Sequence, residues 1–326
     1  MPRLGKRKKK EIEQFDMKKI FTAIVSVTFL FLGTTVQAQQ DPQFTMNMFN
    51  LLYANPGYAG SSNGISATAL HRQQWVGFDG RPITTVANVD ATVKALHGGV
   101  GLSILSDKLG AQYSGGVNVS YAYRLALGPG TLGIGVEGGV LFNTLDGSKL
   151  DPIDETDPNI IAGKANGVAP DLGFGIYYNT DKLYAGISAR HLLGPTLKFE
   201  EGGTLSEYTV ARNYYAMAGY TWDINPTWGL VPSIFLKTDG AATQFDINLR
   251  ALWKNMVWAG VSYRIDDAVG IMAGVDIKQF RIGYSYDVTT SALRNYSSGS
   301  HEIMLGYSYK IKSPVSNQRY RNVRFL

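Results

Sequence analysis

The chain has 326 residues, no cysteine and a formal net charge of +5. The whole positive excess lies in residues 1–38, where eight Lys and Arg residues stand against three Asp and Glu residues. Residues 39–326 are therefore formally neutral, which removes the reason to infer a nucleic-acid-binding surface from the basic sequence pI. The absence of cysteine excludes a lipoprotein anchor and a disulfide framework.

Residues 17–38 have the three parts of a Sec-type signal peptide. Lys18 and Lys19 form a basic start, residues 20–32 are apolar, and Val36 and Ala38 supply the small-residue end. We expect cleavage after Ala38, so that residues 1–38 are a cytoplasmic overhang and a signal peptide that are removed. A single anchoring helix is the alternative, because the apolar run is nearly long enough to span a membrane.

Residues 39–63 open the predicted mature protein and contain little that could form a strand. Pro42, Asn55, Pro56 and Gly57 interrupt any periodic pattern. Large side chains that need an apolar surface are nevertheless frequent: Phe44, Met46, Met48, Phe49, Leu51, Leu52, Tyr53 and Tyr58. We therefore predict an irregular segment that packs against the lumen or the periplasmic rim of the rest of the chain, with docking to a partner protein as the alternative.

From residue 64 to residue 312 the sequence alternates between apolar and polar or small residues. In residues 83–94, for example, Val89 and Ala91 share one face while Asp90 and Thr92 share the other. We count about fourteen such segments: 65–72, 83–94, 100–105, 117–125, 132–142, 172–178, 183–189, 214–222, 230–237, 245–253, 257–263, 269–277, 280–286 and 303–311. The pattern predicts an all-β fold, a transmembrane antiparallel β-barrel of about fourteen strands. A soluble β-sandwich or lipocalin-like barrel also alternates, but this strand number exceeds that of a small barrel.

The connections between these segments alternate in length. Those after even-numbered segments are short, whereas those after odd-numbered segments include the long ranges 73–81, 144–165, 193–212 and 288–300. Outer-membrane barrels have short periplasmic turns and long outer loops, so we expect an integral outer-membrane protein with both termini in the periplasm. Residues 313–326 then form a basic periplasmic tail. The same parity predicts that arginine is poorly tolerated at lipid-facing Val89, Ile247 and Ile271 and costs much less at lumen-facing Thr92 and Asn248.

Charged residues of both signs share the predicted lumen face. We predict a lumen charge network composed of Asp90, Arg124, Glu137, Asp171, Arg190, Asp246, Arg250, Arg264, Asp276, Arg281 and Glu302. Mixed acids and arginines usually pair and hold a plug or neighbouring strands, whereas a selective pore tends to carry one sign of charge. This favours an occluded lumen over an open one.

No motif in the chain points to catalysis or to a cofactor. The four histidines have no metal-ligand spacing, and no nucleophile elbow is present for a Ser/His hydrolase. The acidic run at residues 151–157 matches no EF-hand loop, so a solvated loop is favoured over a cation site. The glycine-rich runs at 98–101 and 133–139 fall inside strands, and we interpret them as positions of tight barrel curvature. We therefore expect a non-enzymatic protein without a cofactor or metal.

Three sequence blocks resemble the PorP/SprF family of outer-membrane barrels. Residues 40–60, QDPQFTMNMFNLLYANPGYAG, carry the most specific likeness; residues 71–82, HRQQWVGFDGRP, and residues 301–307, HEIMLGY, carry further parts. The resemblance spans the whole mature chain but is generic in the middle. It departs from longer members in that only residues 313–326 follow the barrel, which puts a role of a fused peptidoglycan-binding module in doubt.

The resemblance implies a component of the type IX secretion and gliding motility machinery. Its expected partners are outer-membrane lipid, other type IX components, periplasmic lipoproteins and a large secreted adhesin-like substrate, with no nucleic acid. The expected role is to assist export or surface anchoring of such substrates, or to dock periplasmic motor lipoproteins. We expect the plug or partner contacts to be made by Phe44, Met46, Met48, Phe49, Tyr53, Pro56 and Tyr58. The alternative is a general porin or small-solute transporter.

Overall fold

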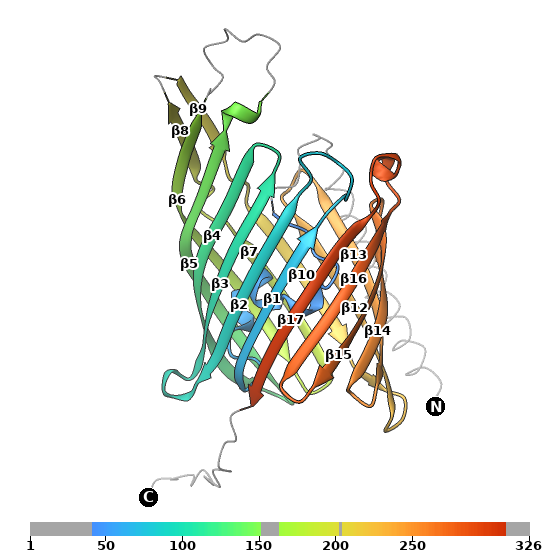
Figure 1. Cartoon of the computed structure of the whole chain (residues 1–326). Coiled ribbons are helices and arrows are strands. Elements are labelled where there is room, and N and C mark those ends of the chain that lie inside the picture. The colour runs from blue at the N-terminus through green and yellow to red at the C-terminus, as the bar shows by residue number, and fades with distance from the viewer. Residues whose placement is uncertain (1–40, 151–162, 202–203, 311–326) are drawn as a thin grey trace, which may run out of the picture.

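The computed structural model describes residues 41–150, 163–201 and 204–310. These residues form a closed antiparallel β-barrel around a short irregular segment (Figure 1). Within them the wall comprises fourteen strands: β1 (Gly64–Gln73), β2 (Ile83–Val93), β3 (Gly98–Leu109), β4 (Gln112–Leu127), β5 (Gly130–Asp146), β6 (Lys164–Asn179), β7 (Leu183–Arg190), β10 (Asn213–Tyr220) continued by β11 (Trp222–Asp223), β12 (Trp228–Thr238), β13 (Thr243–Trp253), β14 (Val257–Arg264), β15 (Ala268–Ile277), β16 (Phe280–Thr289) and β17 (Ser300–Lys310).

The wall closes because its first and last strands pair. β1 lies antiparallel to β17, with Gly64 opposite Lys310, and β10 pairs with both β7 and β12. β10 and β11 are two pieces of one wall strand, since both pair with β12 on either side of Thr221. The predicted transmembrane barrel of about fourteen strands is therefore confirmed.

The two ends of the barrel differ in their connections. The turns that follow β2, β4, β6, β11, β13 and β15 are short, and we call this the short-turn end; the opposite end is the long-loop end. η3 (Lys94–Leu96) lies in a short turn, whereas η4 (Gly147–Lys149) and η5 (Ala292–Asn295) belong to long loops. Gly64 and Lys310, the limits of the wall, both lie at the short-turn end.

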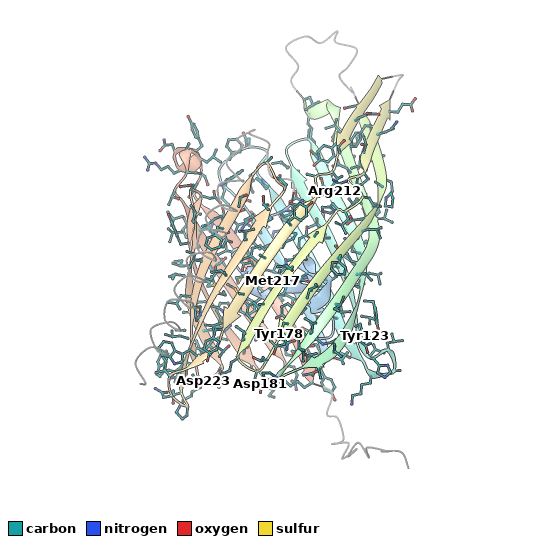
Figure 2. All side chains as sticks on the ribbon, turned by 180° about the vertical axis from the view of Figure 1, so that it is seen from behind. Tyr123, Tyr178, Asp181, Arg212, Met217 and Asp223 are labelled. Atoms are coloured by element: carbon teal, nitrogen blue, oxygen red, sulfur yellow. The ribbon has the colours of Figure 1, made fainter. Side chains whose placement is uncertain are left out.

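Side chains alternate across the wall as the period of two requires. On β4, Asn118 and Ser120 face the lumen and are 3% and 0% exposed, whereas Val119 between them faces outward and is 60% exposed. An apolar outer surface with a polar lumen is the pattern of a barrel whose outside contacts lipid. Figure 2 shows Tyr123 and Tyr178 near the short-turn end, somewhat further from that end than Asp181 of the β6–β7 turn and Asp223 of β11, as expected of an aromatic girdle.

The long connection between β7 and β10 contains a hairpin that the alternation of residues did not predict. β8 (Thr196–Glu201) pairs with β9 (Thr204–Thr209) outside the wall sheet. Leu197 and Phe199 of β8 pack with Ala165 and Ala169 of β6. The hairpin therefore covers part of β6 that extends above the barrel at the long-loop end (Figure 1).

Residues 41–60, which we call the plug segment, lie inside the barrel (Figure 1). They contain three single turns of helix, η1 (Asn47–Phe49), α2 (Leu51–Ala54) and η2 (Pro56–Tyr58). Asp41 contacts residues at the long-loop ends of β7 and β12, whereas Gly60 contacts the short-turn ends of β2 and β3. The expectation that this irregular segment packs in the lumen is confirmed, and the segment runs from one end of the lumen to the other.

No helix in these described ranges is long and apolar enough to cross a membrane. The predicted signal peptide at 1–38, the acidic run at 151–157 and the tail at 313–326 lie outside the described residues. The expected position of both termini in the periplasm lies outside them too and stays a prediction.

Candidate functional site

Thr45 of the plug segment lies at the centre of a buried polar cluster. Its backbone N–H donates to the Glu302 carboxylate at 2.8 Å, and its hydroxyl donates to Asp287 at 2.6 Å. Arg72 pairs with Asp287 at 2.8 Å and with Glu302 at 3.1 Å, while Arg264 donates to the Thr45 hydroxyl at 3.2 Å. All five residues are buried. Because a buried charge without its partner is costly, this cluster ties the plug segment to β1, β14, β16 and β17.

A second contact extends this cluster along β13. The Asp246 carboxylate accepts from the side-chain amides of Gln43 and Asn47, each at 3.0 Å. It also pairs with Arg264 at 3.2 Å, so that one arginine joins Asp246 to Asp287. Two plug side chains thus replace water as hydrogen-bond donors to a buried carboxylate.

The amino end of the plug segment is held by Asp41. Its carboxylate lies 3.0 Å from His191 Nε2 and accepts from the Tyr215 hydroxyl, while Lys237 Nζ donates to its backbone carbonyl at 2.7 Å. His191 Nδ1 lies 3.0 Å from Asp171. The imidazole therefore bridges one carboxylate of the plug segment and one of the wall.

His191 is protonated at neutral pH in this setting. Burial acts to lower the pKa of His191, but the Asp41 carboxylate and the hydrogen bond to Asp171 outweigh it and raise the pKa to about 9. Burial likewise acts to raise the pKa of Asp41, yet His191 and Arg190 hold it well below its usual range. The two shifts agree, and they describe an ion pair between plug and wall.

Apolar side chains fill the lumen between these polar contacts. Phe44, Met46, Met48 and Tyr53 of the plug segment form one buried cluster with wall residues Leu70, Val86, Trp258, Met272 and Met304. A second cluster joins Leu51 and Ala54 to Tyr177, Tyr215, Met217 and Phe235. Burial of these side chains supplies most of the favourable free energy of docking the segment.

Glycines of the wall make room for the backbone of the plug segment. A Cβ at Gly135 would overlap the backbone of Pro56 and Gly57, and one at Gly99 would overlap Ala59 and Gly60. These glycines lie in the runs that we interpreted as positions of tight curvature. That interpretation missed their contact with the plug, because close approach of two backbones leaves no pattern in the sequence.

The carboxyl half of the plug segment ends against β2, β4 and β6. The Tyr58 ring packs edge-on against Tyr177, with 5.2 Å between centroids. The Gly60 N–H donates to Asp90 at 2.9 Å, and the Thr92 hydroxyl donates to the Gly60 carbonyl at the same distance.

Asn248 of β13 also faces the filled part of the lumen, where it is buried beside Asn47 of the plug segment. An arginine at this position would have to displace side chains of the plug segment. The expectation that arginine costs little there assumed free space in the lumen, which the plug segment fills.

The structure brings six of the eleven predicted charged residues together as pairs: Glu137 with Arg190, Asp246 with Arg264, and Asp276 with Arg281. The other five have different partners. Asp171 contacts His191, Glu302 contacts Arg72, and Asp90 contacts the Gly60 amide. Arg124 donates to Asn179 at 2.6 Å. Arg250 contacts aromatic rings and forms no ion pair with a described residue.

Several residues of the site were missed at the sequence level: Asp41, Thr45, Arg72, His191, Lys237 and Asp287. Both Arg72 and Asp287 share the lumen parity of their strands: Arg72 ends the predicted segment 65–72, and Asp287 lies one residue beyond the predicted segment 280–286, so the parity could have found both. His191 lies just beyond β7 with φ of 55°, outside the alternation, and gave no signal.

Cavities remain at both ends of the lumen. One of about 460 Å³ at the short-turn end is lined by Phe49, and one of about 480 Å³ at the long-loop end is lined by Asp41 and Gln43. No three His, Cys, Asp or Glu side chains in the described part of the chain are grouped to hold a metal ion. The arrangement is that of a barrel closed by its own amino-terminal segment.

These features define an integral outer-membrane β-barrel with an internal plug. The chain belongs to the family of type IX secretion system membrane proteins PorP/SprF, whose model matches residues 36–307. No curated protein sequence matches the chain.

Solved barrel structures resemble it only distantly. Outer membrane protein Omp33 of Acinetobacter baumannii is 9% identical with a TM-score of 0.43, over 77% of this chain and all of that one. The toluene transporter TodX of P. putida is 10% identical with a TM-score of 0.44, over 79% of this chain and 94% of that one. The KdgM porin is 12% identical with a TM-score of 0.34, over 75% and 99% of the two chains. Similarity this low supports no inference about the function of this chain.

Proposed function

We propose that this protein is a non-enzymatic outer-membrane component of type IX secretion. In this role it assists the export or surface anchoring of large adhesin-like substrates, or docks periplasmic lipoproteins of the motor. Membership of the PorP/SprF family supports the link to secretion. The plug segment supports a function that does not depend on free diffusion of solutes through the barrel.

The observation that carries this proposal is the occupied lumen. The plug segment is joined to the wall by buried ion pairs at Asp41, by hydrogen bonds to buried carboxylates at Thr45, and by an apolar cluster around Met46. A diffusion porin needs a water-filled path, whereas these contacts close the lumen by replacing water with protein. The protein then offers binding surfaces at its two ends instead of a passage.

The orientation in the membrane is part of the proposal. Outer-membrane barrels place short turns in the periplasm and long loops outside. On this basis the end of the wall at Lys310 faces the periplasm and its lipoproteins, whereas the β8–β9 hairpin and the loop that carries Trp75 face the cell exterior and the secreted substrate. Asp41 then lies on the exterior side of the lumen.

Two measurements separate this function from the alternative of a porin or small-solute transporter. The purified full chain is inserted into a planar bilayer, and the tagged chain is isolated from its own cells in mild detergent. We expect no large steady conductance, together with co-purification of a large secreted protein or a periplasmic lipoprotein. A large steady conductance without such a partner would contradict the proposal and favour the porin.

A further inference from the structure

The outer surface of the wall changes from apolar to charged where β5 and β6 approach the long-loop end. Phe142 of β5 lies opposite Val168 of β6, and both side chains face outward and are exposed. Four residues nearer the long-loop end, Asp146 lies opposite Lys164 on the same face. Such a change along a lipid-facing surface marks the level at which lipid tails give way to headgroups and water.

Three lysines, Lys108, Lys149 and Lys164, gather at this level and form what we call the lysine cluster. The ring centroid of Tyr113 on β4 lies 5.5 Å from Lys108 Nζ and 4.9 Å from Lys149 Nζ, and the Tyr113 hydroxyl accepts from Lys149 Nζ at 3.1 Å. Lys149 Nζ and Lys164 Nζ lie 3.4 Å and 3.7 Å from the same oxygen, Asp146 Oδ2. One tyrosine and one carboxylate therefore hold amino groups from β3, η4 and β6 together.

The lysine cluster carries more positive charge than its carboxylate balances. Within the described part of the chain, Lys149 and Lys164 share Asp146, and Lys108 forms no ion pair. Asp146 Oδ1 also accepts from the Ser148 hydroxyl at 2.6 Å. The side chains of Lys149 and Lys164 are nevertheless 42% and 69% exposed. Their ammonium groups, with three donors each, therefore remain within reach of an anion outside the wall.

We propose that the lysine cluster binds the phosphate group of an anionic lipid headgroup. The cluster lies on the outward face directly beyond exposed Val168, so one lipid can cover the apolar surface with its acyl chains and reach the lysines with its headgroup. Lysine suits a phosphate because its ammonium is a compact charge, and neighbouring ammonium groups can share the phosphate oxygens. Only the choice of leaflet rests on the proposed function, whose orientation places the long-loop end in the outer leaflet.

The test measures binding of lipid A, which carries phosphorylated sugars, to the purified full chain in detergent. Native mass spectrometry gives the fraction of barrels that carry the lipid, and dephosphorylated lipid A is the probe without phosphate. We expect lipid A to bind more tightly than the dephosphorylated probe. Replacing the lysine cluster should weaken lipid A binding about tenfold or more, because each basic side chain near an anionic headgroup adds to the attraction.

The variant combines three substitutions in the lysine cluster: Lys108→Gln, Lys149→Gln and Lys164→Gln. The matched control removes the same charge from exposed lysines in the short turns: Lys182→Gln, Lys254→Gln and Lys278→Gln. A third variant with arginine at the three cluster positions keeps the charge and should still bind lipid A. Only variants that keep the heat-modifiable migration of a folded barrel are compared.

Equal binding of lipid A and the dephosphorylated probe would overturn the proposal, and so would equal affinity for lipid A in the cluster variant and the short-turn control. Inorganic phosphate is the third probe. Complete displacement of lipid A by an equal concentration of inorganic phosphate would show a site for free phosphate and overturn the lipid assignment. None of these outcomes depends on conductance or on co-purified partners, so this site and the proposed function fail separately.

Discussion

Arg72 shows at the scale of one residue how the wall and the plug segment depend on each other. Its guanidinium pairs with Asp287 and Glu302, and the same two carboxylates accept hydrogen bonds from Thr45 of the plug segment. Neither acid would be stable in the buried lumen without these donors. The wall strands carry the charges, and the plug segment completes their hydrogen bonding.

We expect Arg72→Gln to destabilise the folded barrel by about 3–5 kcal/mol, because it leaves buried carboxylates without their main cation. Urea unfolding in lipid vesicles measures this. Lys198→Gln is the control, since Lys198 pairs with Glu207 on the exposed β8–β9 hairpin, and such surface pairs contribute little. A loss for Arg72→Gln as small as that of the control would show that the cluster is not buried as described.

His191 predicts a dependence on pH. Its folded pKa of about 9 exceeds the value of about 6.5 for free histidine, so its contribution to stability is complete below about pH 6.5 and is lost as pH rises through 9. The difference in free energy of unfolding between wild type and His191→Gln should therefore shrink between pH 6.5 and 10. A difference that stays constant over this range would contradict the ion pair with Asp41.

Gly135 tests the close approach of the two backbones. Gly135→Ala should cost about 1–3 kcal/mol, because the added methyl group overlaps the backbone of Pro56 and Gly57. Gly138→Ala on the same strand is the matched control, since its Cβ would meet only Leu172 at an ordinary 3.6 Å. Unfolding in urea compares the two variants. Equal stability would mean that the plug segment does not contact β5 here.

At the scale of the strand, the alternation of side chains fixes which face contacts lipid. Val119→Arg, near the middle of β4, should cost roughly 2–4 kcal/mol, whereas Leu127→Arg at the end of the same strand should cost about 0–1 kcal/mol. Both side chains face outward, so only depth in the bilayer differs. Equal costs for the two variants in vesicle unfolding experiments would show that the assumed depth of β4 in the membrane is wrong.

The wall strands could be predicted from the sequence because each repeats one rule, apolar outward and polar or small inward. Every predicted segment corresponds to a wall strand, and the errors lie where the rule stops. β8 and β9 lie outside the wall, yet Gly202 and Gly203 between two alternating stretches are a hairpin signal that could have been used. Parity alone could not establish the tolerance expected at Asn248, because parity tells which way a side chain points and not whether space is free.

At the scale of the whole molecule, the plug segment converts an open cylinder into a closed one. Its content of apolar side chains predicted that it packs somewhere, and its irregular sequence predicted that it forms no strand. Its path could not be predicted, because contacts such as Thr45 with Glu302 join residues 257 positions apart. The pairing of lumen charges was likewise hidden, since each strand fixes only the face on which its own charges lie.

Hydrogen exchange on the purified full-length barrel, without any partner, tests the plugged lumen most directly. Amides in residues 46–53 should be strongly protected, because buried wall side chains enclose this stretch and its backbone is hydrogen-bonded, as between Met46 and Glu302. Peptides from exposed loops supply the reference for unprotected exchange. Full exchange of residues 46–53 within seconds, in a barrel whose wall strands remain protected, would contradict the account.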